Sequence, residues 1–155
     1  MTYRVRGLSP EPFRHLFGLS EAELSAHGAR RYVADSKPGF PDRIELRDAE
    51  PGETLLLVNH VHQPADTPYR PSHAIFVLEG AGEAYDGFDA LPEAMRVRTL
   101  SLRAFDRDGM MVDGDLGPGE EADVLIRRFF ADPEVDYIHA HYARRGCFAA
   151  RIDRA

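Results

Sequence analysis

The chain has 155 residues, of which 43% are hydrophobic, and its formal net charge at pH 7 is −7. This size and composition predict one globular domain over residues 1–155 with a sizeable core. The acidic balance excludes general electrostatic binding to nucleic acid or to an anionic membrane, so we expect neither as a partner. A single cysteine excludes an internal disulfide, and we find neither a signal-peptide run nor a membrane-length apolar stretch, so we expect a cytoplasmic protein.

The N-terminal part of the chain predicts one strand and two short helices. Residues 2–8 alternate apolar and basic side chains, which is typical of a strand. A first helix is expected over residues 9–18, and a second over residues 20–28, where Ser20 and Glu23 form a capping box. Both are about two turns long, too short to be stable alone, so we expect them to pack on a sheet.

The middle of the chain predicts strands at residues 30–35, 44–47 and 74–78. The strongest apolar run covers residues 54–62 and predicts a central strand. Residues 63–72 hold three prolines and predict an ordered loop.

Residues 79–93 carry five acidic residues and no lysine or arginine. This composition, with its glycines, makes the segment a candidate mobile loop or lid. The alternative is a solvated insertion without a function.

The segment after it predicts a long strand at residues 96–106 and an antiparallel return at residues 110–112. Residues 117–131 predict the best helix of the chain, because acidic residues stand at its start and apolar residues recur four positions apart.

The C-terminal segment predicts a β-hairpin closed by a loop of Arg144, Arg145 and a left-handed Gly146. Its apolar residues alternate in two runs that share one face if the strands pair in phase. The expected pairs on that face are Ile138 with Ile152, Ala140 with Ala150, and Tyr142 with Phe148. On the other face we expect Tyr137 opposite Asp153, His139 opposite Arg151, His141 opposite Ala149, and Ala143 opposite Cys147. This second face is either the solvent face of an edge hairpin or the lining of a pocket.

Strands in succession, rather than strict alternation with helices, indicate an α+β fold. We expect a largely antiparallel mixed sheet with two short N-terminal helices and one longer helix before the C-terminal hairpin.

Three stretches of the sequence resemble an uncharacterised bacterial family, domain of unknown function 1203. They are PGETLLL at residues 51–57, HQPADTPYRPSHAIFV at residues 62–77 and HAHYARRGCFAARIDR at residues 139–154. The resemblance spans nearly the full length. It implies family membership and supplies no catalytic residue, substrate or cofactor, so the cofactor is unknown at this stage.

The leading functional hypothesis is a pocket that binds, and potentially turns over, a small anionic molecule. Arginine suits the bidentate holding of carboxylate or phosphate, and Lys37 is the single lysine among 19 basic residues. The predicted ligand-binding residues are Arg70, His73, Arg103 and Arg151. His73, His139 and His141 would supply hydrogen bonds or transfer protons.

Two rival chemistries use the same region of the sequence. The H-x-H pairs His60/His62 and His139/His141 place two imidazoles on one face of a strand, which suits a metal ion. The predicted metal ligands, if there is a metal-dependent enzyme, are His60, His62 and His73.

Cys147 with His141 could instead form a nucleophile and its base, with His139 as a further catalytic candidate. The alternative for this cysteine is an inert core residue. The third functional class is a non-catalytic interaction module, including a homodimer joined through the hairpin or an edge strand.

Overall fold

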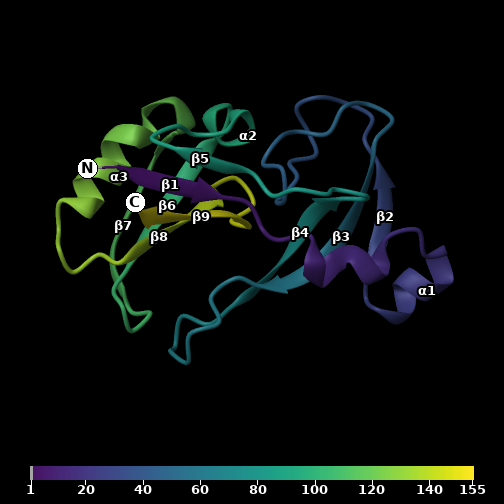
Figure 1. The fold of residues 1–155 in the computed structure, drawn as a ribbon, viewed down its shortest axis with the longest axis horizontal. Helices are drawn as coiled ribbons and strands as arrows, with labels where there is room; N and C mark the ends of the chain where they lie inside the picture. The colour runs from purple at the N-terminus through teal and green to yellow at the C-terminus, as the bar shows by residue number, and fades with distance from the viewer. Residues whose placement is uncertain (1) are drawn as a thin grey trace.

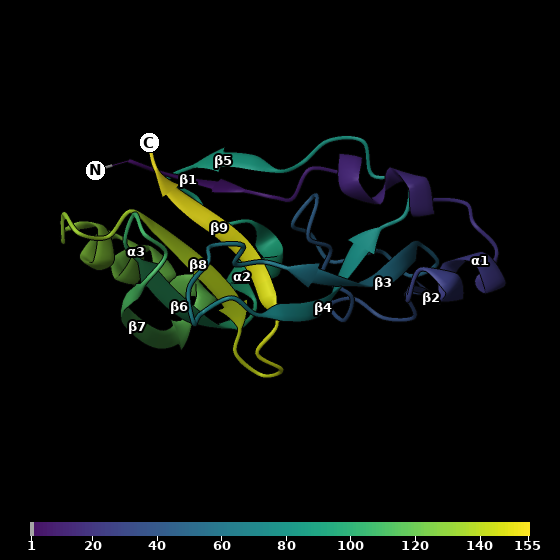
Figure 2. The same cartoon turned by 90° about the horizontal axis from the view of Figure 1, so that it is seen from below.

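In the computed structural model, which describes residues 2–155, the strands form two antiparallel sheets that lie end to end (Figure 1). The larger sheet has the strand order β5–β1–β9–β8–β6–β7 and the smaller one the order β2–β3–β4. The predicted α+β class is confirmed, with the strands divided between two sheets. The two ends of the chain meet beside β1, where the Ala155 amide donates to the Thr2 carbonyl (Figure 2).

The larger sheet consists of β1 (Tyr3–Arg6), β5 (Asp86–Phe88), β6 (Thr99–Phe105), β7 (Met111–Pro118), β8 (Tyr137–Tyr142) and β9 (Phe148–Arg154). One face packs against α3 (Ala122–Phe130), which follows the short helix η2 (Gly119–Glu121). Ile126, Phe129 and Phe130 of α3 join the apolar residues of β6, β8 and β9 in one core. The helix begins later than predicted, because Gly117 and Pro118 still belong to β7.

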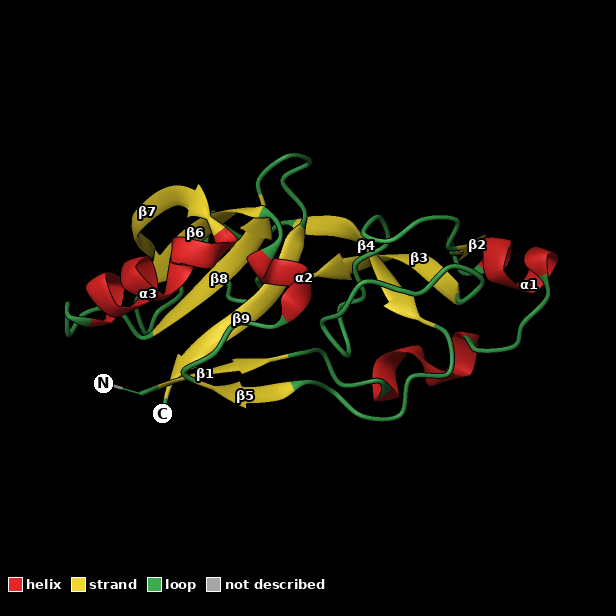
Figure 3. Cartoon of the chain, turned by 90° about the horizontal axis from the view of Figure 1, so that it is seen from above, coloured by secondary structure: helices red, strands yellow, loops and turns green. Residues whose placement is uncertain are grey.

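The smaller sheet consists of β2 (Arg30–Val33), β3 (Thr54–Val61) and β4 (Ser72–Leu78), and β3 is central, as predicted. Two short helices accompany this sheet: η1 (Glu11–Leu16), a 3-10 helix, lies alongside it, and α1 (Glu21–Ala26) lies at its far end (Figure 3). The capping box of Ser20 and Glu23 is present at the start of α1. Both helices contribute to a second core, through Phe13, Leu16 and Leu24.

The predicted strand at residues 44–47 is wrong. Asp42 is buried, and its carboxylate accepts hydrogen bonds from the Glu45 and Leu78 amides. Leu46 adopts a positive φ of 54°, which no strand allows. The segment is therefore a buried turn, because side-chain hydrogen bonds replace those of a sheet.

The acidic segment is built into the fold, and the prediction of a lid is wrong. Asp86 to Phe88 form the edge strand β5, which pairs with β1, and Arg4 binds Asp86 through two hydrogen bonds of 2.5 and 2.6 Å. A four-residue helix, α2 (Glu93–Arg96), ends the segment, so β6 starts three residues later than predicted.

The C-terminal hairpin is confirmed, and it lies inside the larger sheet, between β1 and β6. Of the two alternatives that the sequence leaves open, the edge hairpin is therefore wrong. Four of the expected pairs are confirmed: Tyr137–Asp153, Ile138–Ile152, His139–Arg151 and Ala140–Ala150.

Beyond Ala140 the predicted register is wrong. His141 pairs with Phe148 and the Tyr142 amide donates to the Cys147 carbonyl, so Ala149 is an extra residue in β9. This β-bulge follows a four-residue loop, residues 143–146, in which Gly146 has the predicted positive φ, here 79°. The bulge moves Phe148 to the face of His141, away from the Tyr142 face where its parity had placed it.

No helix within residues 2–155 is both long and apolar enough to cross a membrane.

Glu79 joins several elements of the smaller sheet. It accepts hydrogen bonds from Arg31 of β2 at 2.7 and 2.9 Å, from Thr54 of β3 at 2.9 Å and from the Gly18 amide at 2.8 Å. The bond from Arg31 is the main cause that lowers the pKa of Glu79 from 4.5 to about 2.

We predict that Glu79→Gln destabilises the protein by about 2 kcal/mol at pH 7, because it removes charge-assisted hydrogen bonds. A carboxylate whose pKa is lower in the folded state stabilises above its unfolded pKa, and this contribution is lost as pH falls. The difference between wild type and variant should therefore shrink as pH falls from 4.5 towards 2. Urea unfolding at pH 7 and pH 3 measures both effects. The exposed Glu120→Gln serves as the control, and equal stabilities of wild type and Glu79→Gln at pH 7 would contradict the prediction.

Candidate functional site

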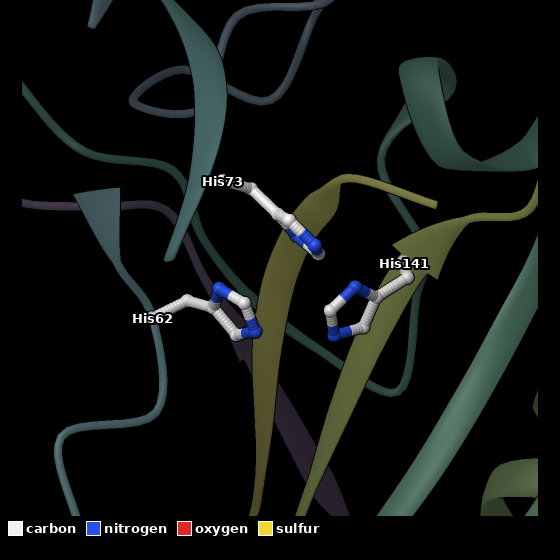
Figure 4. A group of neighbouring side chains, drawn as sticks. All are labelled: His62, His73 and His141. Atoms are coloured by element: carbon white, nitrogen blue, oxygen red, sulfur yellow. The ribbon is translucent and has the colours of Figure 1, made fainter. Parts of the chain in front are cut away.

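Four histidines gather where the two sheets meet. His62 directly follows β3, His73 lies in β4, and His139 and His141 lie on one face of β8. Figure 4 shows the rings of His62, His73 and His141 directed towards one another. One nitrogen from each of these three residues lies within 4.8 Å of the other two. The His139 ring is next to the group, 6.0 Å from the His62 ring centroid. We call His62, His73 and His141 the histidine cluster.

Phe148, displaced by the bulge, forms one wall of the histidine cluster. Its ring stacks on the His62 ring at a centroid distance of 5.2 Å and an interplanar angle of 12°. Its backbone amide donates to Nδ1 of His73 at 3.2 Å. The bulge therefore packs one imidazole and orients another.

The hydrogen bonds of the cluster define which ring nitrogens carry protons. Nδ1 of His141 lies 2.9 Å from the Gly146 carbonyl oxygen, which can only accept, so Nδ1 holds the proton and Nε2 holds a lone pair. In His73 the order is reversed, because Nδ1 accepts from Phe148. Within residues 2–155, the buried Nε2 of His141 and the buried Nδ1 atoms of His62 and His139 find no hydrogen-bond partner.

Burial keeps these imidazoles neutral. It lowers the pKa of His62 to about 4 and the pKa of both His139 and His141 to about 3. The pKa of His73 is lowered as well, first by burial and then by the charge of Arg103. Neutral imidazole is the form that binds a metal ion, whereas it contributes no charge to the binding of an anion.

Arg103 of β6 lies on the same face, directly opposite His139 of β8. Burial lowers its pKa, and its positive charge lowers the pKa of His62, His73, His139 and His141. The structure thus brings together Arg103, His73, His139 and His141 from the predicted anion and catalytic sets.

Arg70 and Arg151, two other predicted ligand-binding residues, stand apart from this group. Arg70 is exposed on the loop after β3, and no hydrogen bond, ion pair or ring contact in residues 2–155 links its side chain to the cluster. Arg151 is exposed, binds Asp153 at 2.7 Å and stacks on the Tyr137 ring at 4.0 Å. On β9 it lies opposite His139, as Arg103 does on β6, and its charge contributes to the lowered pKa of that histidine, but its guanidinium is occupied by Asp153 and Tyr137.

His60, a predicted metal ligand, is replaced in the cluster by His141. Its ring contacts those of Phe13 and Phe148, at 6.2 and 5.9 Å. The H-x-H spacing assumes that His60 and His62 lie on one strand and share a face. It fails here because β3 ends at Val61, so His62 lies outside the strand.

The predicted pair of Cys147 and His141 is not formed. Cys147 lies opposite Tyr142 and packs against the core of the larger sheet, while its Sγ accepts from Nη2 of Arg43 at 3.0 Å. Arg43 is buried, with 2% exposure, and its Nε also donates to the Phe148 carbonyl at 2.8 Å. It thereby fixes the hairpin end against the turn that precedes β3.

Phe148, Arg43 and Gln63 also belong to this region, and the sequence does not mark them as parts of it. The Gln63 amide donates to the Tyr137 hydroxyl at 2.8 Å and fixes the loop that follows β3. Nothing local marks these roles, since each depends on a contact between residues more than 70 positions apart.

Two surface hollows of residues 2–155 contain no cluster histidine in their lining. One, of about 540 Å³, lies between the β6–β7 turn and the connection from α3 to β8. The other, of about 380 Å³, lies under η1 against the end of β3. His62 and His141 are buried and His73 is half-buried, so the space between their nitrogens fits an ion better than an organic molecule.

A family model described as a protein of unknown function, DUF1203, matches residues 39–154. The chain belongs to this family. The matched range includes the histidine cluster and Arg103 but not β1 or the two N-terminal helices. No curated protein and no solved structure matches the chain.

We predict that the metal-free protein at pH 7 holds His141 as the Nδ1-protonated tautomer and His73 as the Nε2-protonated one. Long-range ¹H–¹⁵N correlation spectra distinguish the two nitrogens of each ring. The exposed His15 is the control and should show exchange between tautomers. A spectrum that places the His141 proton on Nε2 would contradict the hydrogen bond to Gly146.

Proposed function

We propose that this protein binds a divalent transition-metal ion, most simply zinc, through His62, His73 and His141. The observation that carries the proposal is the convergence of three neutral imidazoles from three separate strands or strand ends, with nitrogens within 4.8 Å of one another. Zinc prefers imidazole nitrogen, and three histidines with an open fourth position are typical of catalytic zinc.

The surroundings support the same reading. The His141 Nδ1–H donates to the Gly146 carbonyl, which is the outer hydrogen bond that metal-bound histidines usually make. It leaves the buried Nε2 with a lone pair and no partner in residues 2–155. A metal ion supplies the partner that this atom lacks.

Binding requires the imidazoles to draw closer. A tetrahedral zinc centre holds its nitrogens about 2.0–2.1 Å from the ion, and hence about 3.3 Å from one another. Side-chain rotation of His62 and His73 can supply this approach, because both lie at the ends of strands rather than in the middle of the larger sheet.

We predict that the purified protein binds one zinc ion per chain. Changing any cluster histidine to glutamine should weaken zinc binding by about 100-fold or more, since each removes a ligand. Isothermal titration of chelator-treated protein and elemental analysis of untreated protein measure this.

The control for that experiment is His60→Gln. His60 is a histidine of β3 that contacts Phe148 but lies outside the cluster. Circular dichroism of each variant separates loss of a ligand from loss of the fold. Titrations without saturable binding, or an equal loss in His60→Gln, would contradict the proposal.

We further predict that zinc binding releases the Phe148 amide from His73. If the ion binds Nδ1 of His73, it displaces the amide directly. If the ion binds Nε2, the ring proton moves to Nδ1, which then no longer accepts. The Phe148 ¹H–¹⁵N resonance should therefore shift on addition of zinc, while the Ile152 resonance on the same strand should change little. An unchanged Phe148 resonance at saturation would exclude His73 as a ligand.

A further inference from the structure

Arg103 differs from the other arginines of the chain. Within residues 2–155, every other arginine that is not exposed makes a hydrogen bond or an ion pair, for example Arg31 with Glu79 and Arg98 with Asp48. Arg103 is half-buried and makes neither with any described residue. A half-buried guanidinium without a carboxylate beside it is free to bind an anion that is not part of the chain.

The position of Arg103 points to the histidine cluster. On β6 it lies opposite His139, and its neighbour two positions earlier, Ser101, lies opposite His141. Directly paired residues of adjacent strands share a face, so the Arg103 side chain leaves the sheet on the side of the cluster.

Within residues 2–155, no carboxylate forms a hydrogen bond or an ion pair with Arg103, and burial alone lowers its pKa. The charged or ionisable groups that act most strongly on His62, His73, His139 and His141 are arginines and other histidines, and no carboxylate is among them. A divalent ion would add two positive charges beside Arg103. Such an accumulation, partly shielded from water, requires a negative charge nearby.

We propose that the metal centre takes a small oxyanion, a carboxylate or a phosphate group, which binds the ion through one oxygen and the Arg103 guanidinium through another. This inference rests on the proposed metal centre. Three protein ligands leave a coordination position open, and the guanidinium presents a donor fork that matches carboxylate and phosphate oxygens.

The size of the anion is limited by the cover over the site. The loop from Gln63 to Pro71 crosses this region, fixed by Gln63 on Tyr137 and by the Tyr69 ring against the Phe105 ring at 6.2 Å. His62 and His141 are buried, and His73 and Arg103 are half-buried. The group recognised is therefore a compact anionic head.

The experiment uses the protein loaded with cobalt(II), whose visible absorption reports its ligands. Cobalt binding is titrated first in buffer without oxyanions. Acetate and inorganic phosphate are then added in separate titrations. We expect a saturable change in the cobalt spectrum with at least one of the two anions. A response to only one of them identifies the oxyanion that the site prefers.

The matched variants are Arg103→Gln and Arg96→Gln, the latter at an exposed arginine on α2. Arg103→Gln should weaken anion binding about tenfold or more, because it removes a charge-assisted contact. Its cobalt affinity should be equal or higher, since a neighbouring positive charge is gone, whereas a merely structural role would lower it. Arg96→Gln should behave as wild type. Should Arg103→Gln fail to fold, Arg103→Lys keeps the charge without the fork and should still weaken anion binding.

The metal centre and its anion site are tested separately. If cobalt does not bind in the first titration, the metal centre is refuted before any anion is added, and the present inference falls with it. If cobalt binds but neither anion changes its spectrum, or the folded Arg103 variant binds anion as wild type does, the inference is overturned and the metal centre stands.

Discussion

One extra residue in β9 determines how the candidate site is built. Ala149 is the inserted residue of a β-bulge, and it reverses the face on which the preceding residue, Phe148, lies. Without it, Phe148 would point to the core beside Tyr142, and Cys147 would take a place beside the histidines. With it, the Phe148 ring stacks on His62 and its amide binds His73. Bulges are common where a sheet must direct a side chain towards a functional site.

The bulge is in turn held by Arg43, which bridges the two sheets. Its guanidinium donates to the Phe148 and Pro41 carbonyls and lies over the Tyr142 ring at 5.0 Å. Arg98 lies over the same ring at 5.1 Å and binds Asp48. Arg43 thus fixes the hairpin end to the turn before β3. His62 and His73 come from the same part of the molecule, the smaller sheet. Since the cluster draws its ligands from both sheets, its geometry depends on this junction.

Local rules recovered the elements whose hydrogen bonds are local. The Ser20–Glu23 capping box is present, because it needs only residues three positions apart. Parity placed Ile138 opposite Ile152 correctly, because both side chains are fully buried and a slip would expose one of them. Parity failed at Phe148, because both faces of the larger sheet are buried at this position. An aromatic side chain is therefore shielded from water on either face.

The same limit explains the errors elsewhere. Residues 44–47 have the composition of a strand, but Asp42 offers their backbone a side-chain acceptor and a turn results. The acidic residues of 79–93 looked solvated because the basic partners of Glu79 and Asp86, Arg31 and Arg4, lie far away in the sequence. The histidines were identifiable as candidates from the sequence. Their convergence depends on how the two sheets meet, and the apolar periodicity of a single strand does not predict that. His141 therefore could not be preferred over His60 as a ligand.

The energetics of the cluster argue that its arrangement is not incidental. A buried polar atom without a partner costs about 1–3 kcal/mol, and His62, His139 and His141 each hold one such nitrogen within the part of the chain that the structure describes. Their sum is a large share of the roughly 5–15 kcal/mol that stabilises a typical domain. Apolar residues of similar size would fill the same space at lower cost, as Phe148 does beside them. A ligand that binds only the folded chain offsets such a cost, and the stabilisation grows with its concentration relative to its dissociation constant. The ion that we propose, held by neutral imidazoles, would be a ligand of this kind, and it would give Nε2 of His141 a partner that residues 2–155 do not supply.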